Sequence, residues 1–216
     1  MGFLRKTLNW YAKLSPSRGR LKPPYEHVVQ IGDPTLRKIS EEVAIDKIKS
    51  PEIQKVIIIL EHVLNKYKSV GMSAPQIGIN KRIFVIRHSV KQIKTEMPEI
   101  FKSRCMYEVP LTVFINPKLK IVDYQKIVFP EGCESVRSFQ ADVARYRAVE
   151  VIGYNANGEQ FSQKHHGWPA RIVQHEMDHL DGKLYTDIMD RKSLLCTCWD
   201  EVNMSKGKIA IPYYPE

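Results

Sequence analysis

Hydrophobic and polar positions along the chain predict two helices, one early and one late. Residues 50–69 combine an apolar stretch with a helix N-cap at Ser50 and a proline, Pro51, in the first turn, which predicts an early N-terminal helix. A later helix is predicted to begin at Gly167, and Gly182 stands where its C-terminal cap is expected. These two helices frame the middle of the chain.

Short runs rich in β-branched and aromatic residues lie between the helices and predict strands. Residues 145–155 are followed by an Asn157-Gly158 turn and by residues 159–166, which predicts a hairpin. Further runs lie at 82–86, 112–115 and 121–129. We therefore expect an α+β fold in which mainly antiparallel strands pack around the later helix.

Length and composition fit one globular domain with tails. The chain has 216 residues, of which 43% are hydrophobic and 26% charged, so it can bury a core without disulfide staples. Its longest apolar run, residues 56–60, is too short to span a bilayer, so no membrane segment is expected. Its four cysteines show no secreted-domain framework, and the Cys196–Cys198 pair has no matching partner pair, so we expect it to be incidental.

The positive charge is concentrated at the start of the chain. The formal net charge is +9, and the first 25 residues contain no acid. Their basic residues are Arg5, Lys6, Lys13, Arg18, Arg20 and Lys22, which leaves +3 on the rest of the chain. Because this segment mixes basic with apolar residues, it predicts an organelle-import leader, with a disordered basic tail as the alternative. The modest charge of the remainder gives no reason to expect specific nucleic-acid binding.

The later helix contains the sequence RIVQHEMDHLDG, which has the spacing of a metal-binding helix. His175 and His179 are four residues apart and so lie on one helical face, where both imidazoles can bind one ion. Glu176 lies beside that ion. A hydrolytic metal usually has three protein ligands and one open position for water, so a third ligand has to come from elsewhere.

Two upstream stretches offer the remaining chemistry. In PEGCESV, Cys133 follows a predicted strand and could supply a soft thiolate ligand for zinc or ferrous iron, although a lone cysteine is more commonly an inert packing residue. In SVGMSAPQIG, residues 69–78 form a predicted loop of small residues that includes Gln76, whose amide could donate to a developing oxyanion. Alone, that loop would be an ordinary Gly-Pro turn.

Together these stretches resemble the three signatures of the peptide deformylases. Those signatures are G-x-G-x-A-A-x-Q, E-G-C-x-S and Q-H-E-x-D-H-x-x-G, and the chain carries SVGMSAPQ at 69–76, EGCES at 131–135 and QHEMDHLDG at 174–182. Ser69 and Ser73 depart from the first pattern. The resemblance covers roughly residues 28–190, and Glu134 resembles the residue of animal mitochondrial members.

The resemblance implies a hydrolase that removes the formyl group from N-formylmethionine of new polypeptides. Cys133, His175 and His179 would hold one divalent ion, Fe²⁺ or Zn²⁺, with Co²⁺ or Ni²⁺ as substitutes. Glu176 would move the proton from water to the leaving amine. The Gln76 amide and the Glu134 backbone N–H would bind the oxyanion.

The resemblance also implies a set of residues around the substrate. Gly71 would bond the peptide backbone, and Met72 and Ile172 would offer apolar surface nearby. Arg145 matches an arginine that contacts substrate backbone in bacterial members, with a solvated strand residue as the alternative. Positioning roles are expected for three further residues, Glu131, Gln174 and Asp178.

The domain boundaries and partners follow from the same reading. We expect a leader at 1–25, a catalytic domain at 26–190, a C-terminal extension at 191–216 and a location in the mitochondrial matrix. The expected partners are N-formylmethionyl nascent peptides and, transiently, the ribosome, without a membrane or a specific nucleic acid. A homodimer is left open.

Two other functions remain as alternatives. A zinc endopeptidase would need a different third ligand, because Tyr185 occupies the metzincin position, and Glu201 is the downstream candidate. A non-catalytic ribosome-binding or RNA-binding protein on the same scaffold is the second alternative.

Overall fold

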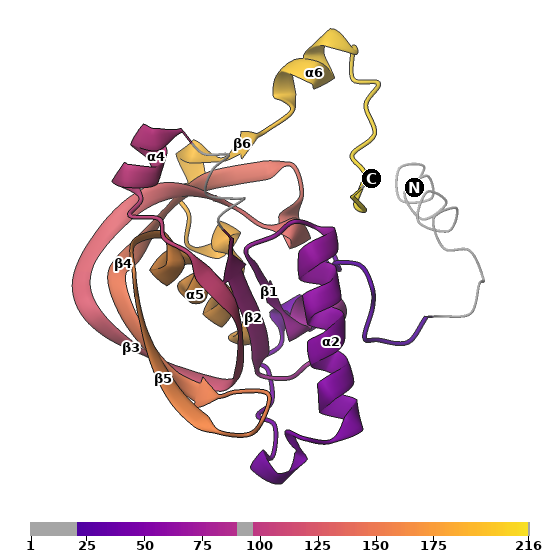
Figure 1. The fold of residues 1–216 in the computed structure, drawn as a ribbon. Helices are drawn as coiled ribbons and strands as arrows, with labels where there is room; N and C mark the ends of the chain where they lie inside the picture. Colours follow the sequence, from indigo (N-terminus) through magenta and orange to yellow (C-terminus); the bar gives the residue numbers. More distant parts are fainter. Residues whose placement is uncertain (1–20, 90–96, 216) are drawn as a thin grey trace.

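The computed structural model describes residues 21–89 and 97–215, so most of the predicted leader lies outside the described residues. Figure 1 shows a curved sheet with one helix on its inner side and another packed against its outer side. The helices are α2 (Pro51–Lys66), α4 (Pro98–Ser103), α5 (Gly167–Leu180) and α6 (Trp199–Met204). The strands are β1 (Gly71–Ser73), β2 (Ile83–His88), β3 (Val109–Gly132), β4 (Phe139–Tyr154), β5 (Gln160–His166) and β6 (Leu195–Cys196).

Short 3-10 helices connect these elements. They are η1 (Pro34–Arg37), η2 (Ile45–Lys47), η3 (Ala74–Ile77), η4 (Glu134–Val136), η5 (Tyr185–Asp187) and η6 (Arg191–Ser193). No helix among the described residues is both long and apolar enough to cross a membrane.

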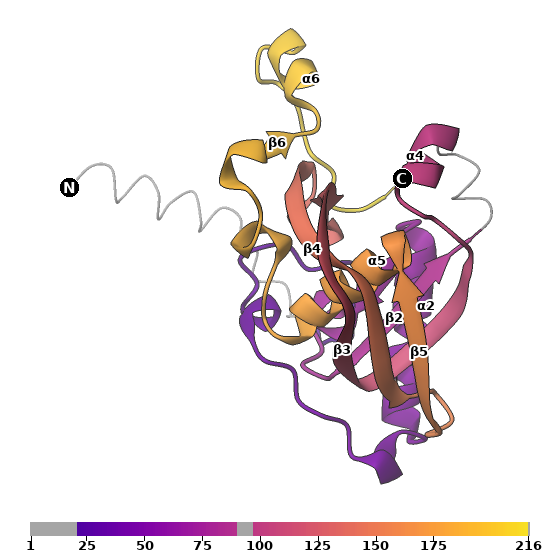
Figure 2. The same cartoon turned by 90° about the vertical axis from the view of Figure 1, so that its left-hand side faces the viewer.

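The sheet has the strand order β1-β2-β3-β4-β5, with β6 paired to β4, and each of these pairs is antiparallel. The predicted α+β class with mainly antiparallel strands is confirmed. The runs predicted at 112–115 and 121–129 belong to one long strand, β3, whose pairing with β4 shifts register at several points. Such bulges bend and twist a strand pair. Figure 2 shows how β3, β4 and β5 curve together beside α5.

The early helix forms where the sequence predicts it. The Ser50 side chain accepts a hydrogen bond from the Ile53 N–H at 3.4 Å, and Pro51 occupies the first turn. Apolar residues three and four apart then bury one face of α2 against β1 and β2, namely Ile53, Val56, Ile57, Leu60, Val63 and Leu64.

Strand β2 is buried on both faces and separates the two helices. Ile83 and Val85 pack in the cluster that contains α2, whereas Phe84 and Ile86 pack in the cluster that contains α5. In Figure 1 the two helices accordingly lie on opposite sides of β2. Helix α5 is thus held inside the curved sheet.

The predicted ends of α5 are confirmed. Gly167 has φ +59°, and a Cβ there would lie 2.6 Å from the Cys105 Cβ and 2.7 Å from its carbonyl oxygen, so only glycine fits. At the other end, Gly182 has φ +70°, the left-handed conformation that commonly ends a helix. The hairpin of β4 and β5 through the turn at 157–158 is also confirmed.

The stretch at 69–78, predicted as a loop, is instead regular structure. It forms β1 and η3, both fully buried. Met72 pairs with Val85 of β2, and the Gln76 side chain accepts hydrogen bonds from Ser73 as part of a capping box. A three-residue strand is too short to show a hydrophobic period, which is why the sequence pattern missed it.

The C-terminal segment returns to the body of the domain. After β6 and α6, which Figure 1 shows projecting above the sheet, the chain runs back toward α2. The Tyr67 hydroxyl donates to the Tyr213 carbonyl at 3.0 Å, and the Lys66 ammonium lies 4.0 Å from the centre of the Tyr214 ring. The last residues are therefore anchored to the end of α2.

Candidate metal centre and its pocket

Cys133 is positioned by the end of a long strand. β3 ends at Gly132, and the Cys133 side chain then caps η4 by accepting a hydrogen bond from the Ser135 N–H at 3.4 Å. That bond holds the sulfur above the turn, facing α5. Cys133 is only partly buried, so its sulfur has access to the pocket.

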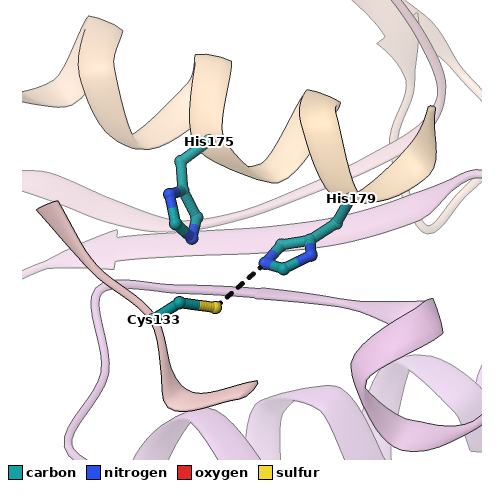
Figure 3. A group of neighbouring side chains, drawn as sticks. All are labelled: Cys133, His175 and His179. Atoms are coloured by element: carbon teal, nitrogen blue, oxygen red, sulfur yellow. Dashed lines mark hydrogen bonds between the residues drawn. The ribbon is translucent and has the colours of Figure 1, made fainter. Parts of the chain in front are cut away.

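The two histidines approach this sulfur from α5. Figure 3 shows both imidazoles projecting from one face of the helix toward Cys133. The His179 Nε2 lies 3.3 Å from the Cys133 Sγ, and the three ligand atoms all lie within 4.8 Å of one another. In a tetrahedral zinc site, with Zn–S about 2.3 Å and Zn–N about 2.0–2.1 Å, ligand atoms stand roughly 3.3–3.6 Å apart. The donor set and the distance between the Cys133 and His179 ligand atoms therefore fit a divalent ion.

Glu131 organises the side of the site opposite the ion. One of its oxygens lies 3.0 Å from the His175 Nδ1, which leaves the His175 Nε2 for a metal. The same carboxylate accepts two hydrogen bonds from Arg145, both at 2.9 Å, and one from Arg171 at 2.7 Å. Burial opposes its ionisation, but the hydrogen bonds from Arg145 and His175 outweigh burial and hold the Glu131 pKa well below its usual range.

Arg145 does not lie at the substrate pocket, where the sequence predicts it. Its side chain is 6% exposed and is held by Glu131 on one side and by Asp178 on the other. It is absent from the described residues that line the pocket around Cys133. The expected substrate contact is therefore not supported, and the alternative of a solvated strand residue is wrong, because Arg145 is a buried member of an ion-pair cluster.

Glu176 is buried next to the backbone of β1. A Cβ added to Gly71 would clash with the Glu176 Oε1, so the absence of a side chain at Gly71 allows the carboxylate to approach the strand. The other oxygen, Oε2, is buried and has no hydrogen-bond partner among the described residues. Burial raises the pKa of Glu176 to about 7, although the neighbouring His175 acts in the opposite direction.

Gln76 has a fixed orientation because its oxygen is already occupied. The Ser73 N–H and hydroxyl both donate to the Gln76 Oε1, at 2.9 and 3.0 Å. The Gln76 amide nitrogen therefore faces the site, 3.3 Å from the Ser135 hydroxyl and 3.7 Å from the Cys133 sulfur. Ser73, a departure from the family pattern, thus helps to aim Gln76.

The Glu134 side chain forms an ion pair at the edge of the cavity, with Arg137, which also lines it. Its carboxylate pairs with Arg137 at 3.1 Å. The backbone of Glu134, directly after Cys133, remains beside the site, as expected for a group that acts through its N–H.

A cavity of about 530 Å³ opens over these groups. Seven of the expected site residues line it: Gly71, Gln76, Cys133, Glu134, Ile172, His175 and Glu176. Met72 is wrong as a pocket residue, because its side chain is fully buried in the cluster that contains α2.

The sequence did not predict several of the lining residues, among them Arg104, Trp168 and Arg171. Arg104 lies over the Trp168 ring, 4.4 Å from its centre, and both line the cavity. Arg171 lines it too, and its buried guanidinium donates to the carbonyls of Ile127, Phe129 and Val143. Arg104 gave no signal in the sequence, but a charged residue within the motif helix was a signal for Arg171.

Glu201, the third-ligand candidate of the zinc endopeptidase alternative, is not part of the group at the metal centre. Tyr185 is buried and stacks on His175 with ring centres 6.4 Å apart, and Glu201 is exposed on α6. Among the described residues, the group of Cys133, His175 and His179 is the one that could hold a metal ion.

Comparisons with known proteins agree with this geometry. The family model for polypeptide deformylases matches residues 25–194. Human mitochondrial peptide deformylase is 40% identical over 185 residues, which cover 86% of this chain and 76% of that protein. The chloroplastic peptide deformylase 1A of Solanum lycopersicum is 38% identical over 180 residues, which cover 83% of this chain and 64% of that protein. The chain thus spans slightly less than two thirds of the plant relative.

Solved structures give the same result for the fold. A class I type b peptide deformylase from Acinetobacter baumannii with Met-Ala-Ser bound has a TM-score of 0.66 and 27% identity, covering 75% of this chain and 96% of that one. A peptide deformylase from Synechococcus elongatus in complex with actinonin has a TM-score of 0.63 and 27% identity, covering 94% of this chain and 97% of that one.

Proposed function

This chain belongs to the peptide deformylase family and removes the formyl group from N-formylmethionine peptides, and we propose that it does so at a metal held by Cys133, His175 and His179. The observation that carries the proposal is the convergence of these three ligand atoms within 4.8 Å of one another beside a cavity that Glu176 and Gln76 also line. The family is metal-dependent, and the donor set fits its metal.

The finer identity of the metal is Fe²⁺ or Zn²⁺, with Co²⁺ and Ni²⁺ as substitutes. One thiolate and two imidazoles suit these ions better than a hard ion such as Mg²⁺. When bound, such an ion supplies Lewis acidity and makes a coordinated water acidic enough to lose a proton near neutral pH. Glu131 supports this centre by accepting a hydrogen bond from the His175 Nδ1–H, which fixes the orientation of that ring.

Glu176 is the group that moves protons in this proposal. Its Oε2 is buried, lacks a partner among the described residues and belongs to a residue that lines the cavity. A carboxylate in this position accepts the proton of the attacking water and donates it to the nitrogen of the leaving amine. The formyl carbon–nitrogen bond then breaks, and formate and a free amine are the products.

Gln76 and Glu134 stabilise the negative charge that develops on the formyl oxygen. The Gln76 amide nitrogen faces the site because Ser73 occupies its oxygen, and the Glu134 N–H lies in the turn that follows the metal ligand. A preorganised donor of this kind is typically worth about 3–4 kcal/mol of transition-state stabilisation.

The peptide lies along the backbone of Gly71 in this proposal, with Ile172 on the apolar wall of the cavity. N-formylmethionyl nascent peptides are the substrates. Transient ribosome contact and a homodimer remain predictions that no observation in the fold tests.

The proposed location is the mitochondrial matrix. The human relative is mitochondrial, although the tomato relative is chloroplastic, and residues 1–25 have the composition of an import leader. Residues 26–190 would then form the catalytic domain and residues 191–216 an extension. A fluorescent reporter fused to residues 1–25 should enter mitochondria, and a cytosolic reporter would contradict the location.

The direct test of the chemistry is formate release from N-formyl-Met-Ala-Ser, chosen because the Acinetobacter structure has Met-Ala-Ser bound. The parent protein, purified anaerobically, should release formate. Glu176→Gln should retain the metal and lose most of the activity, because the amide keeps the shape and cannot accept the proton. Activity of Glu176→Gln within a few-fold of the parent would remove Glu176 from the mechanism.

The same protein also tests the alternatives. Cleavage of an internal peptide bond without formate release would favour a zinc endopeptidase. Absence of both activities in the metal-loaded protein would favour a non-catalytic ribosome-binding protein.

A further inference from the structure

The two groups assigned to the oxyanion come from separate parts of the chain. Gln76 lies in η3 and Glu134 in η4, and neither element pairs with the other in the sheet. Both must nevertheless be held at one point for their donors to act on one oxygen. A segment without regular secondary structure, residues 28–31, contacts both.

Three consecutive residues of this segment donate hydrogen bonds to η3 and η4, the two loops that hold Gln76 and Glu134. The Val29 N–H donates to the Gln76 carbonyl at 2.9 Å, and the Ile31 N–H donates to the Ser135 carbonyl at 2.7 Å. Between them, the Gln30 side-chain amide donates to the Glu134 carbonyl at 2.8 Å. Val29, Gln30 and Ile31 therefore connect both loops to one segment of the chain.

The segment is itself anchored at its start. The Val28 N–H donates to the Tyr67 hydroxyl at 3.2 Å, and that hydroxyl donates in turn to the Tyr213 carbonyl at 3.0 Å. Val28 and Val29 are both buried. Residues 28–31 are thus connected through Tyr67 to the end of α2 and to the C-terminal segment.

We propose that residues 28–31 form a positioning element for the oxyanion-binding groups, with the Gln30 side chain as its key contact. This inference rests on the proposed function. Gln30 is the residue of this segment that forms its contacts through its side chain. It donates to the carbonyl of Glu134, the residue whose N–H is proposed to bind the oxyanion. A second bond from the same amide to the Val28 carbonyl, at 3.2 Å, keeps Gln30 from turning away.

Gln30 touches neither the ligand atoms nor the cavity, so it is a positioning residue and not a catalytic one. Its removal leaves Cys133, both histidines and Glu176 in place and frees the Glu134 turn to shift. Because misplacement by about 1 Å can cost up to 10²-fold in rate, a loosened oxyanion donor should lower kcat while substrate binding changes little.

The chain offers a matched control in Gln54. Its side-chain amide also donates to two backbone carbonyls, those of Ile48 at 2.9 Å and Ala156 at 3.0 Å, and it likewise ties two separate segments together. Both glutamines are half-buried and neither lines the cavity, but Gln54 lies on α2 and bonds neither the η3 nor the η4 segment. Loss of either amide removes the same kind of contact, and only one of the two concerns the oxyanion.

The experiment compares Gln30→Ala, Gln30→Met and Gln54→Ala in the full-length, metal-loaded protein. We measure kcat and KM for formate release, metal content and thermal unfolding. Both Gln30 variants should lose roughly tenfold or more in kcat with KM within about twofold of the parent and metal content unchanged. Gln54→Ala should keep kcat within about twofold, even where its unfolding temperature falls as far as that of Gln30→Ala. Gln30→Met keeps the side-chain length but lacks the hydrogen-bond donor. It therefore tests the positioning role even if Gln30→Ala folds poorly.

Parent-like kcat in Gln30→Met would overturn the inference, as would an equal loss of kcat in Gln54→Ala. An increase in KM with kcat unchanged would also overturn it, because that pattern belongs to substrate binding. Absence of formate release by the parent would be a different failure, that of the proposed function itself.

Discussion

Replacing Arg145 with methionine separates a structural role from a substrate contact. Methionine keeps much of the apolar length of the side chain and removes the charge. Arg145 donates two hydrogen bonds to Glu131 and one to Asp178, and its side chain is 6% exposed. Removing one partner of a buried ion pair typically costs about 3–5 kcal/mol.

The lower end of that range applies here, since Glu131 keeps Arg171 and His175 as partners in the variant. We therefore expect a loss of about 3 kcal/mol in the free energy of unfolding. In a domain of this size, each kcal/mol lowers the unfolding temperature by about 2–4 °C, which gives a decrease of roughly 6–12 °C.

Arg147 provides the matched control. It lies two residues further along β4, but its side chain is 53% exposed and pairs with Asp123 at the surface, at 2.7 Å. Because exposed pairs contribute about 0–1 kcal/mol, Arg147→Met should unfold within about 4 °C of the parent.

The assay is thermal unfolding of the metal-loaded variants, with KM measured on the same preparations. For Arg145→Met we expect the lower unfolding temperature and a KM within about threefold of the parent. The opposite result, an unfolding temperature like that of the parent together with a KM raised about tenfold, would show that Arg145 contacts the substrate and that its buried ion pairs contribute little stability.

Two further predictions concern a close contact and a buried histidine. In Gly71→Ala, the new Cβ would clash with the Glu176 Oε1, so the carboxylate must move, and kcat should fall by about tenfold or more. A kcat like that of the parent would mean that the position of Glu176 is not critical. Burial lowers the pKa of His165 to about 4, so between pH 6.5 and 4 the unfolded chain binds a proton that the folded chain excludes. This histidine therefore contributes stability above pH 6.5 that is lost as the pH falls toward 4, by at most about 3 kcal/mol. Denaturant unfolding of His165→Gln should show a smaller loss over the same range, and parallel curves for variant and parent would contradict it.

Features that depend on nearby residues were predictable from the sequence. Ser50 and the left-handed Gly182 each cap a helix through contacts with residues close in the sequence. The placement of His175 and His179 on one face follows from helical geometry. The third ligand, Cys133, is different, because its approach to α5 depends on the course of β3. From its neighbours in the sequence, Cys133 could be either a packing residue or a metal ligand. Only the resemblance of residues 131–135 to a family motif favoured the assignment as a ligand.

The errors at Met72 and Arg145 have a common physical origin, namely the direction in which a strand side chain points. Arg145 lies on the same face of β4 as Ala141 and Val143, both of which are buried, so the alternation of the strand already indicated an inward side chain. A charged residue on such a face needs buried partners. Its partners, Glu131 and Asp178, come from other elements, which only the fold brings together.

The central claim, that a centre of Cys133, His175 and His179 performs deformylation, is tested most directly by metal stoichiometry and formate release in Cys133→Ser. Cys105→Ser is the control, because Cys105 is exposed and is not part of the metal group. We expect Cys133→Ser to keep its fold, retain less metal and lose formate release by orders of magnitude, while Cys105→Ser behaves like the parent. Full metal occupancy with normal turnover in Cys133→Ser would show that Cys133 is not a ligand and that the third ligand lies elsewhere.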